Sequence, residues 1–258
     1  MASLENKVVF ITGASAGIGK ACAYSFAQEK ANVVLTARRG EVVNEIANNL
    51  KSEYGIQAHA AKLDITNYDE VKEVIANLPN EFKKIDILVN NAGLGRGLNK
   101  LFEDDPTGWH EMIDTNVKGL LFVTRQVVPQ MVERKEGHVI NIGSIAGHEA
   151  YPKGGVYCST KHAVTAITKS LRMDLIDKNV RVSTVDPGMV ETEFSEVRFY
   201  GDKQRAKDVY KGIKPLVAED IADAVIFCAS RPAHVNINEM IIMPSVQASA
   251  FVTHREEA

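Results

Sequence analysis

A tyrosine and a lysine at i,i+4 spacing are the residues of this sequence best suited to proton transfer. Tyr157 and Lys161 begin a segment with helical periodicity, so both side chains lie on one face. An ammonium group beside a phenol favours the phenolate and lowers the phenol pKa from its usual value of about 10. Such a phenol can exchange a proton with an alcohol or a carbonyl. Ser144 follows a predicted strand, where its hydroxyl could hold the reacting oxygen.

A glycine-rich turn near the start of the chain has the features of a dinucleotide site. It reads TGASAGIG over residues 12–19, between an apolar strand and a helix. Glycine lets the backbone approach a pyrophosphate, whose charge is attracted by the N–H groups of the helix start. A tight turn without a ligand is the alternative. The residues expected to bind the dinucleotide here are Gly13, Ser15, Ala16, Gly17, Ile18 and Gly19.

The end of the second predicted strand indicates which dinucleotide binds. An NAD site usually has an acidic residue there for the ribose hydroxyl, whereas this sequence has Arg38 and Arg39. Two guanidinium groups can hold a 2′-phosphate through charge-assisted hydrogen bonds. NADP is therefore the predicted cofactor, the alternative being that both arginines are solvated charges before a helix.

Short apolar runs alternate with amphipathic segments along the chain, which is typical of a parallel sheet with helices on both faces. Strands are predicted at 7–11, 32–37, 57–61, 85–90, 138–142, 181–185 and 239–243. Helices are predicted at 18–29, 41–53, 68–78, 106–133, 156–178 and 219–230. The prediction is one α/β domain over residues 1–258, a doubly wound seven-stranded parallel sheet (Rossmann fold) with ligands at the carboxyl ends of the strands.

One segment, residues 189–215, interrupts this alternation and is called the lid segment below. It carries mixed charges and aromatic residues between the sixth predicted strand and the next helix. A long excursion at that edge of the sheet is typical of a lid over a substrate. A surface insertion without a role is the alternative.

Composition limits the possible partners. The chain of 258 residues is 45% hydrophobic and 24% charged, with a net charge of −3. Disorder and a fibrous role are excluded by this composition, and no positive excess drives binding to nucleic acid or an anionic membrane.

Cys22, Cys158 and Cys228 form no CxxC pair or disulfide framework, and we expect no metal site. With no signal core or membrane span in the sequence, the expected location is cytoplasmic.

Together, these motifs resemble the short-chain dehydrogenase/reductase family over essentially the whole chain. The motifs are TGxxxGxG, Asn90-Asn91-Ala92-Gly93, Asn116, Ser144, the Tyr157–Lys161 pair and Pro187-Gly188. The resemblance implies that Tyr157 is the general acid/base, and that Lys161 lowers its pKa and bonds the nicotinamide ribose. It also implies that Ser144 positions the substrate oxygen and that Asn116 helps to anchor a proton-relay water.

The same resemblance implies further cofactor contacts. Asn91 would support the centre of the sheet and face the cofactor ribose. Asp64, followed by Ile65, matches the adenine-binding aspartate. Residues 187–192 would cover the nicotinamide amide, and the members predicted to bind are Pro187, Gly188, Val190 and Thr192. Taken singly, Asn116 could be only a hydrogen-bonding residue at a helix bend, and Asp64 an acid at a helix start.

Segments outside the shared motifs resemble the NADP-dependent 3-hydroxy acid dehydrogenase branch, whose members are also described as serine or L-allo-threonine dehydrogenases. They are residues 190–199, Gly201-Asp202, residues 232–238 and Met243-Pro244. The carboxylate of a 3-hydroxy acid needs a cation or several N–H donors. The cations considered are Arg198, Lys203 and Arg205 in the lid segment and Arg96 after the fourth strand, with Arg198 taken as the substrate residue. Solvated surface charges are the alternative.

Two other functions stay open from the sequence. The protein could be a broad-range NADPH-dependent carbonyl reductase, or a steroid or polyol dehydrogenase, with the same chemistry. It could also be a non-enzymatic, NADPH-sensing interaction protein. The resemblance implies a homo-oligomer, commonly a tetramer built through two long helices. The apolar positions Leu120, Leu121, Val123 and Val127 fit such an interface, and core packing explains them equally well.

Overall fold

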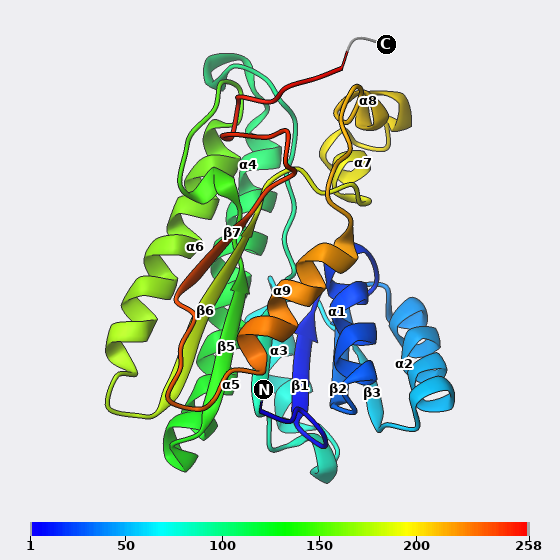
Figure 1. Ribbon diagram of the computed structural model, residues 1–258, viewed down its shortest axis with the longest axis vertical. Coiled ribbons are helices and arrows are strands. Elements are labelled where there is room, and N and C mark those ends of the chain that lie inside the picture. The colour runs from blue at the N-terminus through cyan, green and yellow to red at the C-terminus, as the bar shows by residue number, and fades with distance from the viewer. Residues whose placement is uncertain (1, 257–258) are drawn as a thin grey trace.

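The seven predicted strands all form and lie in one parallel sheet (Figure 1). The structure is a computed structural model that describes residues 2–256. The strands are β1 (Val8–Thr12), β2 (Asn32–Ala37), β3 (Ala58–Lys62), β4 (Ile87–Asn90), β5 (Gly137–Ile142), β6 (Val180–Pro187) and β7 (Glu239–Ile242). Their order across the sheet is β3-β2-β1-β4-β5-β6-β7, with every neighbouring pair parallel. This confirms the doubly wound fold.

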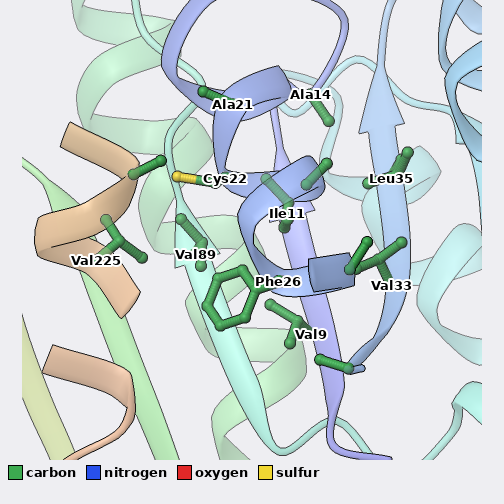
Figure 2. Packing of buried hydrophobic residues seen from close by; sticks show 14 of the residues in the cluster. Val9, Ile11, Ala14, Ala21, Cys22, Phe26, Val33, Leu35, Val89 and Val225 are labelled. Atoms are coloured by element: carbon green, nitrogen blue, oxygen red, sulfur yellow. The ribbon is translucent and has the colours of Figure 1, made fainter. Parts of the chain in front are cut away.

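Helices cover both faces of the sheet. One face packs against α1 (Gly17–Gln28), α2 (Gly40–Tyr54) and α9 (Ala218–Ala229). The other packs against α3 (Tyr68–Ala76), α5 (Leu120–Arg134) and α6 (Gly155–Asp174). Figure 2 shows Cys22 and Phe26 of α1 packed beside Val225 of α9 over the central strands. Two apolar layers therefore hold the strand ends in fixed positions.

The long helix predicted at 106–133 is interrupted. It divides into α4 (Pro106–Ile113), a π-helical segment η3 (Asp114–Gly119) and α5. Gly119 packs so closely on Ile65 that a Cβ at this position would lie 2.6 Å from Ile65 Cδ1. A π-helical turn adds a residue to the helix and is frequent at functional sites. Among the four apolar positions considered for an interface, only Leu121 is exposed, and core packing accounts for the other three.

The lid segment contains two short helices, α7 (Phe194–Arg198) and α8 (Lys203–Asp208). The C-terminal residues 247–256, called the tail below, run beside it (Figure 1). The Glu256 amide donates to the carbonyl of Gly212 at 2.8 Å, and Arg255 Nη2 donates to Val209 O at 3.0 Å. The tail thus holds the lid segment. Over residues 2–256, no helix is long and apolar enough to cross a membrane.

Candidate active site

A cavity of about 810 Å³ opens at the carboxyl ends of the strands, where ligands were expected. The predicted residues that line it are Gly13, Ser15, Ala16, Gly17, Ile18, Arg38, Arg39, Asp64, Ile65, Asn91, Ser144, Tyr157, Lys161, Pro187, Gly188, Val190, Thr192 and Arg198. Two predicted site residues, Gly19 and Asn116, lie behind its wall. The fold therefore brings the glycine-rich turn, the Tyr157–Lys161 pair and the lid segment to one cavity.

The glycine-rich turn is shaped by contacts that exclude larger residues. Gly13 has a φ of 67°, and a Cβ at this position would lie 2.8 Å from Ala92 Cα. Gly19 packs against Gly13 O and Asn91 Nδ2 with no room for a Cβ. The Asn91 amide donates to Thr12 O at 2.9 Å and to Gly13 O at 3.1 Å. Asn91 thus supports the turn through the centre of the sheet, and Gly19 acts through packing rather than by facing the cavity.

Two arginines stand at the mouth of the cavity beside this turn. Arg39 Nε donates to Ser15 Oγ at 3.1 Å, and Arg39 Nη2 lies 3.1 Å from Glu193 Oε2 in the lid segment. Both arginines line the cavity, and so do Asp64 and Ile65. The Asp64 carboxylate accepts hydrogen bonds from the amide and hydroxyl of Thr66, at 3.0 and 2.8 Å. A phosphate-accepting turn followed by two cations and no acid at the strand end fits NADP.

Tyr157 lies half-buried beside Ser144 and Arg198. Burial raises the pKa of Tyr157 above its ordinary value, while the Arg198 guanidinium and a hydrogen bond with Ser144 oppose that rise. Ser144 also accepts a hydrogen bond from the Ala146 amide at 3.1 Å, which orients its side chain. The phenol and the serine hydroxyl can therefore hold one substrate oxygen between them.

Lys161 lies deeper than the phenol. Its Nζ donates to Ile142 O at 2.9 Å and lies 6.0 Å from the centroid of the Tyr157 ring. Burial lowers the pKa of Lys161 to about 8, and the carboxylate of Asp186 acts in the opposite direction. Here the cation that lowers the Tyr157 pKa most is Arg198, whose Cζ lies 4.7 Å from the ring centroid. The expected effect of Lys161 on Tyr157 stays a prediction.

Arg198 is the one of the four candidate cations that lines the cavity. Its Nη2 donates to Tyr151 Oη at 3.0 Å, its Cζ lies 5.2 Å from the Phe194 ring centroid, and its buried Nε has no partner among the described residues. Gly95 makes this possible, because a Cβ there would lie 2.8 Å from Arg198 Nε. A guanidinium that lines the cavity beside the phenol can bind an anion.

The other three cations are engaged elsewhere or face away from the cavity. Arg96 pairs with Glu111 at 2.7 Å and also donates to Val197 O. Arg205 stacks over Phe199 with its Cζ 4.3 Å from the ring centroid, and Lys203 is exposed. None of the three lines the cavity.

Asn116 holds the wall of the site from behind. Its Oδ1 accepts from the Leu94 amide at 2.8 Å, and its Nδ2 donates to Leu94 O at 2.8 Å and to Thr160 Oγ1 at 3.0 Å. The side chain, which is 2% exposed, thereby ties the loop after β4 to α6 one residue before Lys161. Asn116 lies in the π-helical segment η3, where the predicted uniform helix is interrupted.

Several cavity residues carry no signal in the sequence, and three of them shape the site. They are Tyr151, Phe194 and Gln247, which comes from the tail. Burial raises the pKa of Tyr151 to about 12, so its hydroxyl stays a hydrogen-bond donor at neutral pH. Gln247 Oε1 accepts from the Met189 amide at 2.9 Å, which fixes the residues after Gly188. The sequence carries no motif at these positions, and only the lid prediction pointed towards Phe194.

The family model described as short chain dehydrogenase matches residues 7–201. The NADP-dependent 3-hydroxy acid dehydrogenase of Schizosaccharomyces pombe (strain 972) is 44% identical over all of both chains. Sulfoacetaldehyde reductase 2 of Chromohalobacter salexigens is 42% identical, over 96% of this chain and 99% of its own. The closed form of serine dehydrogenase complexed with NADP+ has a TM-score of 0.90 and 43% identity, over 97% of this chain and 100% of that one.

Proposed function

The chain belongs to the short-chain dehydrogenase family, and on that premise we propose that it transfers a hydride between NADP and a small 3-hydroxy acid. Candidate substrates are L-serine, L-allo-threonine and acids like 3-hydroxypropionate. The observation that carries this proposal is the position of Arg198, whose guanidinium lines the cavity with its Cζ 4.7 Å from the Tyr157 ring centroid. A similar 3-hydroxy acid dehydrogenase and a similar NADP-bound serine dehydrogenase support it.

In the proposed mechanism the protein binds and deprotonates the substrate. Arg198 and Tyr151 hold the carboxylate, so that the 3-hydroxyl group lies against Ser144 and Tyr157. Tyr157, as phenolate, takes the hydroxyl proton, and in the reverse direction it returns that proton to the carbonyl oxygen. The nicotinamide, when bound, accepts or supplies the hydride. Asn116 ties the loop after β4 to the start of α6. We propose that it also helps to anchor the water of the proton relay.

The residues that would hold NADP fall into three groups. The turn Gly13, Ser15, Ala16, Gly17, Ile18, with Gly19 packed behind it, would bind the pyrophosphate. Arg38 and Arg39 would bind the 2′-phosphate, with Asp64 and Ile65 beside the adenine. The nicotinamide half would lie against Asn91, Tyr157, Lys161, Pro187, Gly188, Val190 and Thr192.

Cofactor choice has a direct test. Replacing Arg38 and Arg39 together by Ala removes both cations at the cavity mouth. We expect the Kd for NADPH to rise roughly 10- to 150-fold, the loss of one or more hydrogen bonds to a charged group. The Kd for NADH, which has no 2′-phosphate, should stay within a factor of about two. Cofactor fluorescence measures both constants, and equal losses for the two cofactors would refute the assignment.

A substrate panel tests the function itself. NADP+ and NAD+ reduction would be followed with L-serine, L-allo-threonine, 3-hydroxypropionate, uncharged secondary alcohols, polyols and a steroid. Turnover with NADP+ and 3-hydroxy carboxylates is the expected result. Turnover of uncharged alcohols alone would make the protein a carbonyl reductase or a steroid or polyol dehydrogenase. Tight NADPH binding without any turnover would make it an NADPH-sensing protein.

The anionic group of the substrate could be a carboxylate or a sulfonate, and a pair of substrates distinguishes the two. One arginine and one tyrosine hydroxyl can bind a sulfonate as well as a carboxylate. Because one similar protein is a sulfoacetaldehyde reductase, the panel includes sulfoacetaldehyde beside a 3-oxo acid in the reductive direction. The ratio of the two kcat/KM values decides which anion the site prefers.

We further propose a homotetramer in the cytoplasm. Support for assembly comes from large apolar side chains exposed on α5 and α6, namely Leu121 (42%) and Met173 (69%). Both residues lie on the two long helices through which the family resemblance implies assembly, and the mass of the protein in solution, measured by light scattering, tests the proposal.

A further inference from the structure

Behind the active site, outside the cavity, three titratable side chains lie in a row. His148 Nε2 lies 3.0 Å from Asp186 Oδ2 and 3.4 Å from Glu239 Oε1. The three come from the loop after β5, the end of β6 and the start of β7. The side chain of Asp186 is completely buried, whereas that of Glu239 is one-third exposed (33%). The row therefore runs from the surface to the interior.

Asp186 ends this row directly beside the catalytic segment. Its Oδ2 also accepts from Thr184 Oγ1 at 2.5 Å, while its buried Oδ1 has no hydrogen-bond partner among the described residues. That free oxygen lies against Gly143, where a Cβ would overlap it. Gly143 links Ile142, whose carbonyl accepts from Lys161 Nζ, to Ser144. A buried carboxylate and a buried ammonium thus approach the same short stretch of backbone.

Titratable groups lie on both sides of Asp186. His148 and Glu239 lie towards the surface, and Lys161 lies towards the cavity. Arg172 of α6 also faces Glu239 at the exposed end of the row. Burial raises the pKa of Asp186, and the hydrogen bonds from Thr184 and His148 oppose this rise and favour the anion. For Lys161 the carboxylate of Asp186 is the charge that counteracts burial.

We propose that Asp186 is a positioning residue for Lys161: its buried carboxylate, held by His148 and Thr184, keeps Lys161 in the ammonium form. Only the ammonium can both donate to Ile142 O and favour a phenolate at Tyr157. Glu239 and His148 act on Lys161 through Asp186. The inference rests on the proposed function in one respect, because the charge of Lys161 affects turnover only if the protein is a dehydrogenase.

The test is a titration of Lys161 itself in the protein without cofactor. Competitive acetylation with acetic anhydride, read by peptide mass spectrometry, gives the pH midpoint at which this amine becomes reactive. In Asp186→Asn, which keeps the side-chain shape, we expect the midpoint to fall by about one pH unit, since an adjacent opposite charge has been removed. Asp186→Glu restores the charge and should restore the midpoint. An unchanged midpoint in a folded Asp186→Asn protein overturns the proposal.

A matched control is a second buried aspartate, which lies at the opposite, amino ends of the strands. Asp86 precedes β4 and accepts a hydrogen bond from the Val8 amide at 2.9 Å, while its Oδ1 lies 3.7 Å from the Nζ atoms of Lys7 and Lys84. Asp86→Asn should leave the Lys161 midpoint unchanged, and an equal shift there would overturn the proposal. If Asp186→Asn does not fold, Gly143→Ala displaces the carboxylate by the clash of its Cβ and should lower the midpoint in the same direction.

Turnover gives an independent readout. Alcohol oxidation requires the Tyr157 phenolate, which the Lys161 ammonium favours. Loss of that charge at lower pH in Asp186→Asn raises the pKa of Tyr157, so the rise of the oxidation rate with pH moves to higher pH, while the rate at the alkaline plateau stays close to that of the parent protein. A uniform loss at every pH would indicate structural damage and overturn the proposal. The acetylation result stands even if no 3-hydroxy acid is turned over, which separates this inference from the proposed function.

Discussion

Tyr157→Phe is expected to lower kcat for 3-hydroxy acid oxidation roughly 10²- to 10⁴-fold, the usual contribution of a positioned acid or base. The variant loses only the hydroxyl, whereas the ring keeps its packing against Arg198 and Phe194, whose ring centroid lies 5.6 Å away. NADPH affinity should therefore change little. Stopped-flow or steady-state rates measure the first quantity, and cofactor fluorescence measures the second.

The matched control for this variant is Tyr210→Phe. Tyr210 also lines the cavity, and its hydroxyl interacts with Ser195 Oγ and donates to Val190 O, at 2.8 and 2.7 Å. It lies in the lid segment, and its hydroxyl bonds to Ser195 and Val190 rather than to Ser144, so its loss should have a much smaller effect on kcat. If the two variants lose kcat equally, or if Tyr157→Phe stays active, the phenol of Tyr157 is not the acid/base.

Arg198→Ala is expected to lower kcat/KM for anionic substrates about 30-fold or more. Removing one partner of a buried, hydrogen-bonded charge pair costs about 2 kcal/mol or more, and each 1.4 kcal/mol is about tenfold. Reduction of an uncharged ketone should change little. The reductive direction is the right one, because losing the guanidinium raises the pKa of Tyr157 further and so leaves the phenol in its acid form.

Arg205→Ala is the control for the loss of a positive charge from the lid segment. Arg205 lies over Phe199 and does not line the cavity, so this variant keeps Arg198 in place. We expect anionic and uncharged substrates to be turned over as in the parent protein. Equal losses of both substrate classes in Arg198→Ala would mean that Arg198 shapes the site without binding the anion.

The parts of this site that the sequence predicted are those with strong local signals. The strands β1 and β2 are continuous apolar runs, because parallel strands are buried on both faces, and their limits were found within one residue. The glycine-rich turn needs residues without a Cβ, as at Gly13, so its chemistry is visible in the sequence. The Tyr157–Lys161 spacing likewise follows from helix geometry alone.

The parts that the sequence could not predict depend on contacts between distant segments. The sequence does not distinguish Arg198 from Arg96. In the folded protein Arg96 pairs with Glu111, whereas Arg198 lies beside Tyr157. Gln247 reaches the cavity because the tail folds back over the strand ends. The π-helical segment contains Asn116, whose side chain bonds to Leu94 and Thr160, and helical periodicity in the sequence does not show such contacts.

The strand order has a consequence for how the chain is made. β1 lies between β2 and β4, and its second neighbour is synthesised only after β3 and α3. Until β4 pairs with β1, the growing chain has an unpaired central strand, which is a template for unwanted association. The Gly13 turn lacks the Asn91 amide during the same interval. A pause in synthesis after β1 and β2 have left the ribosome, but before β4 has, would therefore favour aggregation. The dinucleotide can stabilise the fold only after β4 has paired with β1.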